Sequence, residues 1–172
     1  IEHVGIPTMP AVRMAAEALK ELGMHREGVQ LIVSGGIRSG ADVAKAIALG
    51  ADAVSIGTAA LIALGDNNPE LEEEYNKLGT SAGFYDEWQA GDDPAGITTQ
   101  DEKLAARLDP KKGGEKLANY LKVLTLEAQT LARACGKSHI RNLEPEDLNA
   151  LTLEASAMAK VPLAGTDWIP GK

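Results

Sequence analysis

Two short apolar runs that each end in glycine constrain this chain more than any other feature of its sequence. The first, residues 29–33, leads into Ser34-Gly35-Gly36, and the second, residues 53–56, leads into Gly57-Thr58. A helix is expected between them, because Ser39 is a good N-cap residue with Asp42 three positions later and Gly50 can end the helix. Strand, helix and strand joined by short links indicate a parallel sheet.

The glycines at the two strand ends predict a phosphate site. A strand that stops at glycine before a helix leaves backbone N–H groups free, and two such ends side by side form a pocket for a phosphate dianion. Parallel (β/α)8 barrels hold phosphorylated cofactors in this way at the ends of their last two strands. The residues predicted to bind the phosphate are Ser34, Gly35, Gly36, Ile37, Arg38, Gly57 and Thr58. The alternatives are that the glycines only make tight turns and that Arg38 pairs with a neighbouring carboxylate.

The chain divides into three segments in the sequence. Residues 1–65 read as the last βα units of a (β/α)8 TIM-type barrel, with a helix at 8–22 capped by Thr8. Residues 66–113 are rich in Gly, Asp, Glu and Pro and read as a long loop insertion with a short acidic helix near 70–78. Residues 114–172 read as a C-terminal helical extension. The predicted fold class is therefore α/β, the C-terminal portion of such a barrel with an insertion and added helices.

Apolar side chains predict how the later segments pack. Helices are expected at 115–134 and 145–160, and a tail after 160. Cys135 is interpreted as a buried structural thiol in the last turn of the first of these helices. The expected inward residues are Leu117, Leu121, Leu124, Ala128 and Leu131 on the first helix and Leu148, Leu151, Ala155 and Met158 on the second, while Phe84, Tyr85 and Trp88 favour an ordered, packed insertion.

Composition excludes several classes of partner. The 172 residues carry a formal net charge of −8, which argues against nucleic acid and anionic membrane surfaces as general partners. No apolar run is long enough to span a membrane, and the start of the chain does not resemble a signal peptide, so a cytoplasmic protein is expected. Since the chain lacks an initiator Met and opens within what reads as a loop, we expect it to be part of a longer polypeptide.

Two further sites are weaker candidates. His3, in the opening loop, would lie near substrate if that loop belongs to the catalytic face of a barrel, although the loop also reads as a stub without its context. Lys137, His139 and Arg141 follow a helix end, where cations more often offset the helix dipole than bind substrate. No Ser-His-Asp triad, metal-ligand spacing or P-loop is present, so no metal is expected and no catalytic residue is assigned.

The motifs taken in order resemble the FMN-binding domain of the glutamate synthase family over most of the chain. Residues 3–7 (HVGIP) resemble the loop after the sixth barrel strand, 34–40 (SGGIRSG) the seventh-strand phosphate loop, and 57–61 (GTAAL) the end of the eighth strand. Residues 93–101 (DPAGITTQD) resemble the stretch after the iron–sulfur ligands. The resemblance implies FMN as cofactor and reduction of an imine formed from a 2-oxo acid and a nitrogen donor.

One departure from the family pattern concerns the iron–sulfur cluster. The family places three cysteines between the third and fourth of these motifs, residues 57–61 and 93–101, whereas this interval has none and Asp93 stands at the last cysteine position. Since such clusters rely on thiolate ligands, no iron–sulfur cluster is expected from this chain. The pattern resembles the branch that includes the N-methylglutamate synthase large subunit.

This resemblance also implies the partners. The substrates would be 2-oxoglutarate or glutamate with ammonia or methylamine, and the other partners the preceding barrel segment and amidotransferase-like subunits. The chain by itself is not expected to be active. The loop at Gly35 alone would also fit 2-hydroxy-acid oxidases and IMP dehydrogenase-like barrels, although the oxidases usually carry Arg after the glycine where Thr58 stands. A non-catalytic half-barrel is the remaining alternative.

Overall fold

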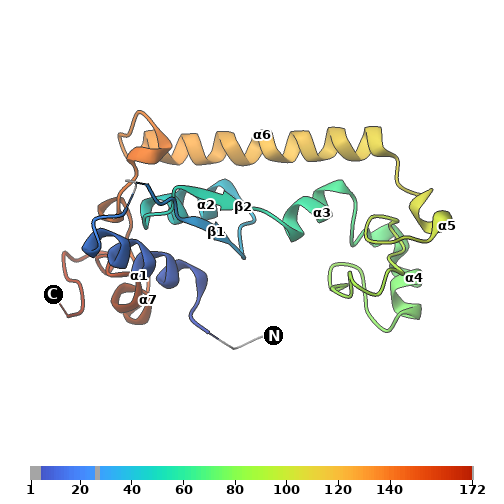
Figure 1. Cartoon of the computed structure of the whole chain (residues 1–172), viewed down its shortest axis with the longest axis horizontal. Helices are drawn as coiled ribbons and strands as arrows, with labels where there is room; N and C mark the ends of the chain where they lie inside the picture. Colours follow the sequence, from blue (N-terminus) through green and yellow to red (C-terminus); the bar gives the residue numbers. More distant parts are fainter. Residues whose placement is uncertain (1–4, 26–27, 172) are drawn as a thin grey trace. The chain divides into compact units, whose positions relative to one another are not determined.

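The computed structural model describes residues 5–25 and 28–171, so the expected role of His3 lies outside the described residues. This part of the chain is mixed α/β, with seven α-helices and a small parallel sheet (Figure 1). It divides into two compact units: unit 1 comprises Ile1–Ile56 with Val123–Lys172, and unit 2 comprises Gly57–Lys122. Within the described ranges, no helix is both long and apolar enough to cross a membrane.

Unit 1 is built around the two glycine-ended strands. β1 (Ile32–Ser34) and β2 (Ala53–Ser55) pair in parallel, with Ser34 opposite Ser55, so both strands end at the same edge. α2 (Gly40–Ala48) connects them, and α1 (Thr8–Glu21) contacts β1, α2 and α7 (Leu153–Ala159). A buried apolar cluster of three alanines and one leucine, Ala44, Ala48, Ala132 and Leu143, joins α2 to α6 (Pro110–Ala134) and to the segment after it.

The Ser39 cap is confirmed and accounts for the start of α2. The N–H of Asp42 donates to the Ser39 hydroxyl at 3.4 Å, and Asp42 in turn accepts the N–H of Arg38 at 3.1 Å. Although residues 29–33 are nearly all apolar, only one face of β1 is covered: Val33 is buried, whereas Ile32 is 63% exposed. The Thr8 cap is wrong: Thr8 is the first helical residue, and Pro7 stands at the cap position without a side-chain hydrogen bond.

Unit 2 consists of short helices held by a buried polar network. α3 (Thr58–Leu64) is followed by the 3₁₀ helix η1 (Pro69–Leu71), α4 (Glu72–Lys77), α5 (Glu102–Ala105) and the first turns of α6. The insertion is packed as expected at Tyr85, which is buried with its ring centroid 5.5 Å from that of Tyr75. Phe84 is 79% exposed, which contradicts the expectation for that residue.

The C-terminal helices differ from the sequence expectation. The expected helix at 145–160 is wrong: the 3₁₀ helices η2 (Ile140–Asn142) and η3 (Pro145–Asp147) precede a separate α7. Leu148 is extended, and Thr152 starts α7 anew by accepting the N–H of Ala155. Leu151 and Met158 are consequently exposed rather than buried.

α6 also starts earlier than expected. The Asp109 carboxylate accepts the N–H groups of Lys111 and Lys112, which caps the helix at Pro110 despite the two glycines that follow. Cys135 is exposed, which contradicts its interpretation as a buried thiol, because α6 ends at Ala134 and the chain turns away. On the expected apolar face, Leu124 and Ala128 are buried, whereas Leu121 and Leu131 are 41% and 36% exposed.

Candidate phosphate-binding loops

The first predicted loop, residues 34–38, follows β1 at the edge where β2 also ends. Gly35 and Gly36 have φ values of +100° and +73°, a region that favours glycine. A side chain at Gly36 would meet no atom within 4 Å, and one at Gly35 would meet only the Thr8 hydroxyl oxygen at 3.7 Å. The backbone therefore has open space beside it at these two positions.

The backbone N–H groups from Gly35 to Gly40 fall into two sets, those with a hydrogen-bond partner and those without one. The N–H of Arg38 donates to Asp42 at 3.1 Å and that of Gly40 to the Glu127 carboxylate at 2.7 Å, so these two already have anionic partners. For the N–H groups of Gly35, Gly36 and Ile37, no hydrogen bond is found among the described residues. These three donors remain for a phosphate or for water.

Arg38 lies beside a carboxylate of its own helix. Its Nε is 3.5 Å from Asp42 Oδ2, and its side chain is 80% exposed. Burial raises the pKa of Asp42, but hydrogen bonds from Lys45 and from the Arg38 backbone, together with both cationic charges, outweigh it and hold the pKa below its ordinary value. Arg38 therefore has a neighbouring carboxylate as its partner, as in the alternative to phosphate binding that the sequence left open.

The second predicted loop begins unit 2. Gly57 is the residue before α3, and Thr58 is the first residue of that helix. The carbonyl oxygen of Gly57 accepts the N–H groups of Ala60 and Leu61, at 2.8 and 3.2 Å. Gly57 therefore initiates a helix directly after β2, as the sequence predicts, and the part that it and Thr58 play in binding phosphate stays a prediction.

Asp93, the residue at the expected cysteine position, is fully buried. Its Oδ1 accepts the N–H of Ala95 at 2.9 Å, and its Oδ2 accepts the N–H groups of Ile97 and Thr98 at 2.9 and 3.1 Å. The Tyr75 hydroxyl also donates to Oδ1 at 3.3 Å. These bonds give Asp93 a structural role as the anchor of the turn that follows it. Over residues 5–25 and 28–171, no group of three or more His, Cys, Asp or Glu side chains is arranged to hold a metal ion.

A second carboxylate, Asp66, is buried in the same network. It accepts the N–H of Asn67 at 2.8 Å and the indole N–H of Trp88 at 2.8 Å. Burial and the charge of Asp93 raise the pKa of Asp66, although both hydrogen bonds oppose this. Burial and the two carboxylates likewise raise the pKa of Tyr75, which therefore stays protonated and donates.

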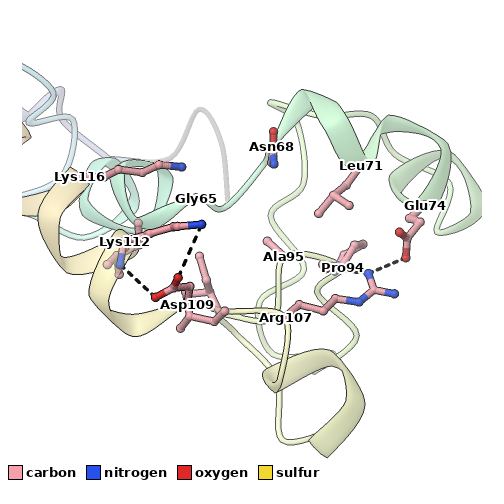
Figure 2. A pocket seen from close by; sticks show the side chains of 14 residues that line it. Gly65, Asn68, Leu71, Glu74, Pro94, Ala95, Arg107, Asp109, Lys112 and Lys116 are labelled. Carbon is pink, nitrogen blue, oxygen red and sulfur yellow. Dashed lines mark hydrogen bonds and ion pairs between the residues drawn. The ribbon is translucent and has the colours of Figure 1, made fainter.

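Unit 2 also contains a pocket of about 420 Å³ that no sequence pattern indicated (Figure 2). Its walls are partly apolar, and its charges are mostly matched. Arg107 donates to Glu74 at 2.7 Å and to the Pro94 carbonyl at 2.9 Å, and Lys112 lies 3.9 Å from Asp109. Because these cations come from separate elements, their meeting was not visible in the sequence.

Comparison with known proteins decides the family. The model of the conserved region in glutamate synthase matches residues 1–69 and 89–138. The chain belongs to the glutamate synthase family. This is a family of oxidoreductase enzymes, and the resemblance noted in the sequence is confirmed at that level.

Individual relatives agree with this assignment. The glutamate synthase large subunit-like protein of Rhizobium meliloti is 72% identical over all 172 residues, which correspond to 39% of its length. The archaeal glutamate synthase [NADPH] of Methanocaldococcus jannaschii is 42% identical over 83% of this chain and 24% of its own. The isopentenyl-diphosphate delta-isomerase of Deinococcus radiodurans is 46% identical over 54 residues, 31% of this chain and 14% of its own. No solved structure matches the chain.

The chain thus spans well under half the length of these relatives. The short match to an isomerase indicates that a stretch of this size can occur in enzymes with a different reaction. The family assignment therefore depends on the much longer matches to the glutamate synthases.

Proposed function

We propose that the protein containing this chain is an FMN-dependent oxidoreductase that forms glutamate or N-methylglutamate, and that this chain binds the FMN phosphate. The observation that carries the proposal is the loop after β1, where Gly35, Gly36 and Ile37 offer N–H groups without a partner in the described part of the chain. Backbone N–H groups at a strand-to-helix turn suit a phosphate dianion. Family membership and the (β/α)8 topology expected from the sequence are consistent with it.

The role of the chain in this proposal is to bind and orient. FMN would supply hydride transfer to an imine, which is the chemistry of the cofactor itself. The loop of residues 34–38 would fix the phosphate, and the contribution of Gly57 and Thr58 is the one predicted from the sequence. The preceding barrel segment would contribute the flavin-ring and substrate contacts, and amidotransferase-like subunits would deliver nitrogen.

The proposal places no iron–sulfur cluster in this segment. The 172 residues contain one cysteine, so a thiolate-ligated cluster would need its ligands from elsewhere. Asp93 is already bonded to four donors and is buried, which suits an anchor better than a ligand.

A charge placed at Gly36 tests the phosphate site. Gly36→Asp in the full-length protein adds a carboxylate in open space, and Asp tolerates positive φ better than most residues. Gly36→Asn is the matched neutral control. Titration with FMN and with riboflavin, which lacks the phosphate, gives two dissociation constants for each variant.

Wild type and Gly36→Asn should prefer FMN over riboflavin, whereas Gly36→Asp should lose about a hundredfold of that preference, as expected for a like charge in a partly buried site. Riboflavin affinity should change little. Equal affinity of the wild type for the two flavins, or an unchanged preference in Gly36→Asp, would overturn the proposed site.

A further inference from the structure

Unit 1 contains a pocket of about 290 Å³ at the C-terminal end of α2, here named the α2 C-terminal pocket. Three segments form it: α1 from Arg13 onward with the turn after it, the last turn of α2 with Gly50, and residues 143–146. The phosphate loop precedes α2 at its other end. Nine helical residues separate the two ends, about 13 Å of helix.

A buried arginine lines this pocket. Arg13 is 8% exposed, and its Nε is a buried donor with no hydrogen-bond partner in the described part of the chain. Its Nη2 lies 3.4 Å from the Glu17 carboxylate, a distance that leaves the guanidinium only loosely paired. A buried, unsatisfied donor costs free energy, so its presence beside a cavity points to a ligand.

The same wall carries a second cation. Lys20 lies two turns further along α1 and also lines the pocket. No ion pair or hydrogen bond is found for its side chain within the described ranges. Arg13 and Lys20 together suit a carboxylate, which accepts several N–H donors at once.

The facing walls have the opposite polarity. Glu144 and Glu146 line the pocket from residues 143–146; Glu144 pairs with Lys137 at 2.8 Å, whereas Glu146 has no ion pair in the part of the chain described. The C-terminal end of α2 adds partial negative charge. The Gly50 carbonyl oxygen, 3.0 Å from His25 Nε2, completes this side.

We propose that the α2 C-terminal pocket binds a free α-amino acid. Its carboxylate would face Arg13 and Lys20, and its ammonium group would face Glu146 and the C-terminal end of α2. A simple anion such as phosphate would also meet the two glutamates, and a simple cation would meet Arg13, so a zwitterion matches the pocket better than either. The volume is near the lower end for ligand sites, which suits a molecule of this size.

Calorimetric titration of the full-length protein tests this inference. The probes are L-alanine, L-glutamine and L-methionine, with propionate and ethylamine as compounds that carry only one of the two charged groups. At least one amino acid should bind saturably, and neither single-charge compound should. Lys20→Gln and Glu146→Gln should each weaken that binding about tenfold or more.

Matched controls separate this pocket from other sites. Lys122→Gln and Glu154→Gln change exposed residues that do not line it, and both should bind as the wild type does. Binding that is unchanged in Lys20→Gln and Glu146→Gln would show that the amino acid binds elsewhere and would overturn the proposal. Absence of saturable binding up to about 10 mM would overturn it as well. The Gly36→Asp variant should bind the amino acid as the wild type does, even if its preference for FMN is lost. The two proposals can therefore fail independently of each other.

Discussion

Gly40 makes room for a neighbouring helix and not for a ligand. It lies in the motif that resembles a phosphate loop, yet a Cβ there would lie 2.5 Å from the Ala128 nitrogen and 2.6 Å from Glu127 Cβ. Its N–H donates to the Glu127 carboxylate. Gly40 therefore lets α6 cross the start of α2, whereas Gly35 and Gly36 have open space beside them.

Substituting Gly40 should consequently destabilise unit 1. Gly40→Ala forces backbone atoms of α2 and α6 apart, and we expect a loss of about 2–4 kcal/mol of local stability, as for other overpacked sites. Hydrogen exchange of α2 peptides in the full-length protein measures it. Gly114→Ala is the control: it lies within α6 with no atom near the added carbon, and should stabilise slightly. Equal exchange in Gly40→Ala and wild type would contradict the close approach.

Asp42 is the residue on which the start of α2 depends. Its pKa is lowered in the folded state, so its contribution to stability is present above the unfolded pKa of 3.8 and is lost as the pH falls through the folded value. Asp42→Asn should therefore cost about 1 kcal/mol near neutral pH and much less once the pH lies well below 3.8. Exchange protection of α2, corrected for the intrinsic rate at each pH, checks this. A loss of the same size at both pH values would contradict the ion pairing.

At the scale of elements, unit 2 depends on a few buried polar side chains more than on long helices. Asn67 ties two segments together: its Nδ2 donates to the Tyr85 carbonyl at 3.0 Å, and its Oδ1 accepts the Tyr85 N–H at 2.8 Å. Asp66, Tyr75 and Asp93 continue the network. The insertion is ordered because these groups satisfy one another away from water.

This network predicts an unusual pH response. The pKa of Asp66 is raised on folding, so the folded state binds more protons above pH 3.8, and stability falls as the pH rises through the folded value. Exchange protection of peptides 66–93, corrected for intrinsic rates, should decrease as the pH rises from 3.8 through the folded pKa of Asp66. Asp66→Asn should flatten the decrease, and Asp86→Asn, an exposed neighbour, should not. Protection that rises with pH in the wild type would contradict the raised pKa.

At the scale of the whole molecule, the nitrogen donor separates the two proposed products. The complete complex should be assayed with glutamate plus methylamine and with glutamine plus 2-oxoglutarate. The proposed N-methylglutamate-forming activity predicts N-methylglutamate from the first pair. Glutamate from the second pair alone would rule out N-methylglutamate and leave ordinary glutamate synthesis. Product from neither pair, with flavin bound, would contradict both.

The family resemblance, the parallel pair of strands, the Ser39 cap and the glycine loop could all be predicted from the sequence, because each is encoded by neighbouring residues. The break between η3 and α7 was missed, since apolar spacing across residues 145–160 fits a helix and the local cap at Thr152 overrides it. The roles of Gly40, Arg13 and Asp93, in contrast, depend on how the chain folds. Glu127 lies 87 positions from Gly40, Tyr75 lies 18 positions from Asp93, and Arg13 is buried by packing between elements; no local pattern specifies which distant segments pack together.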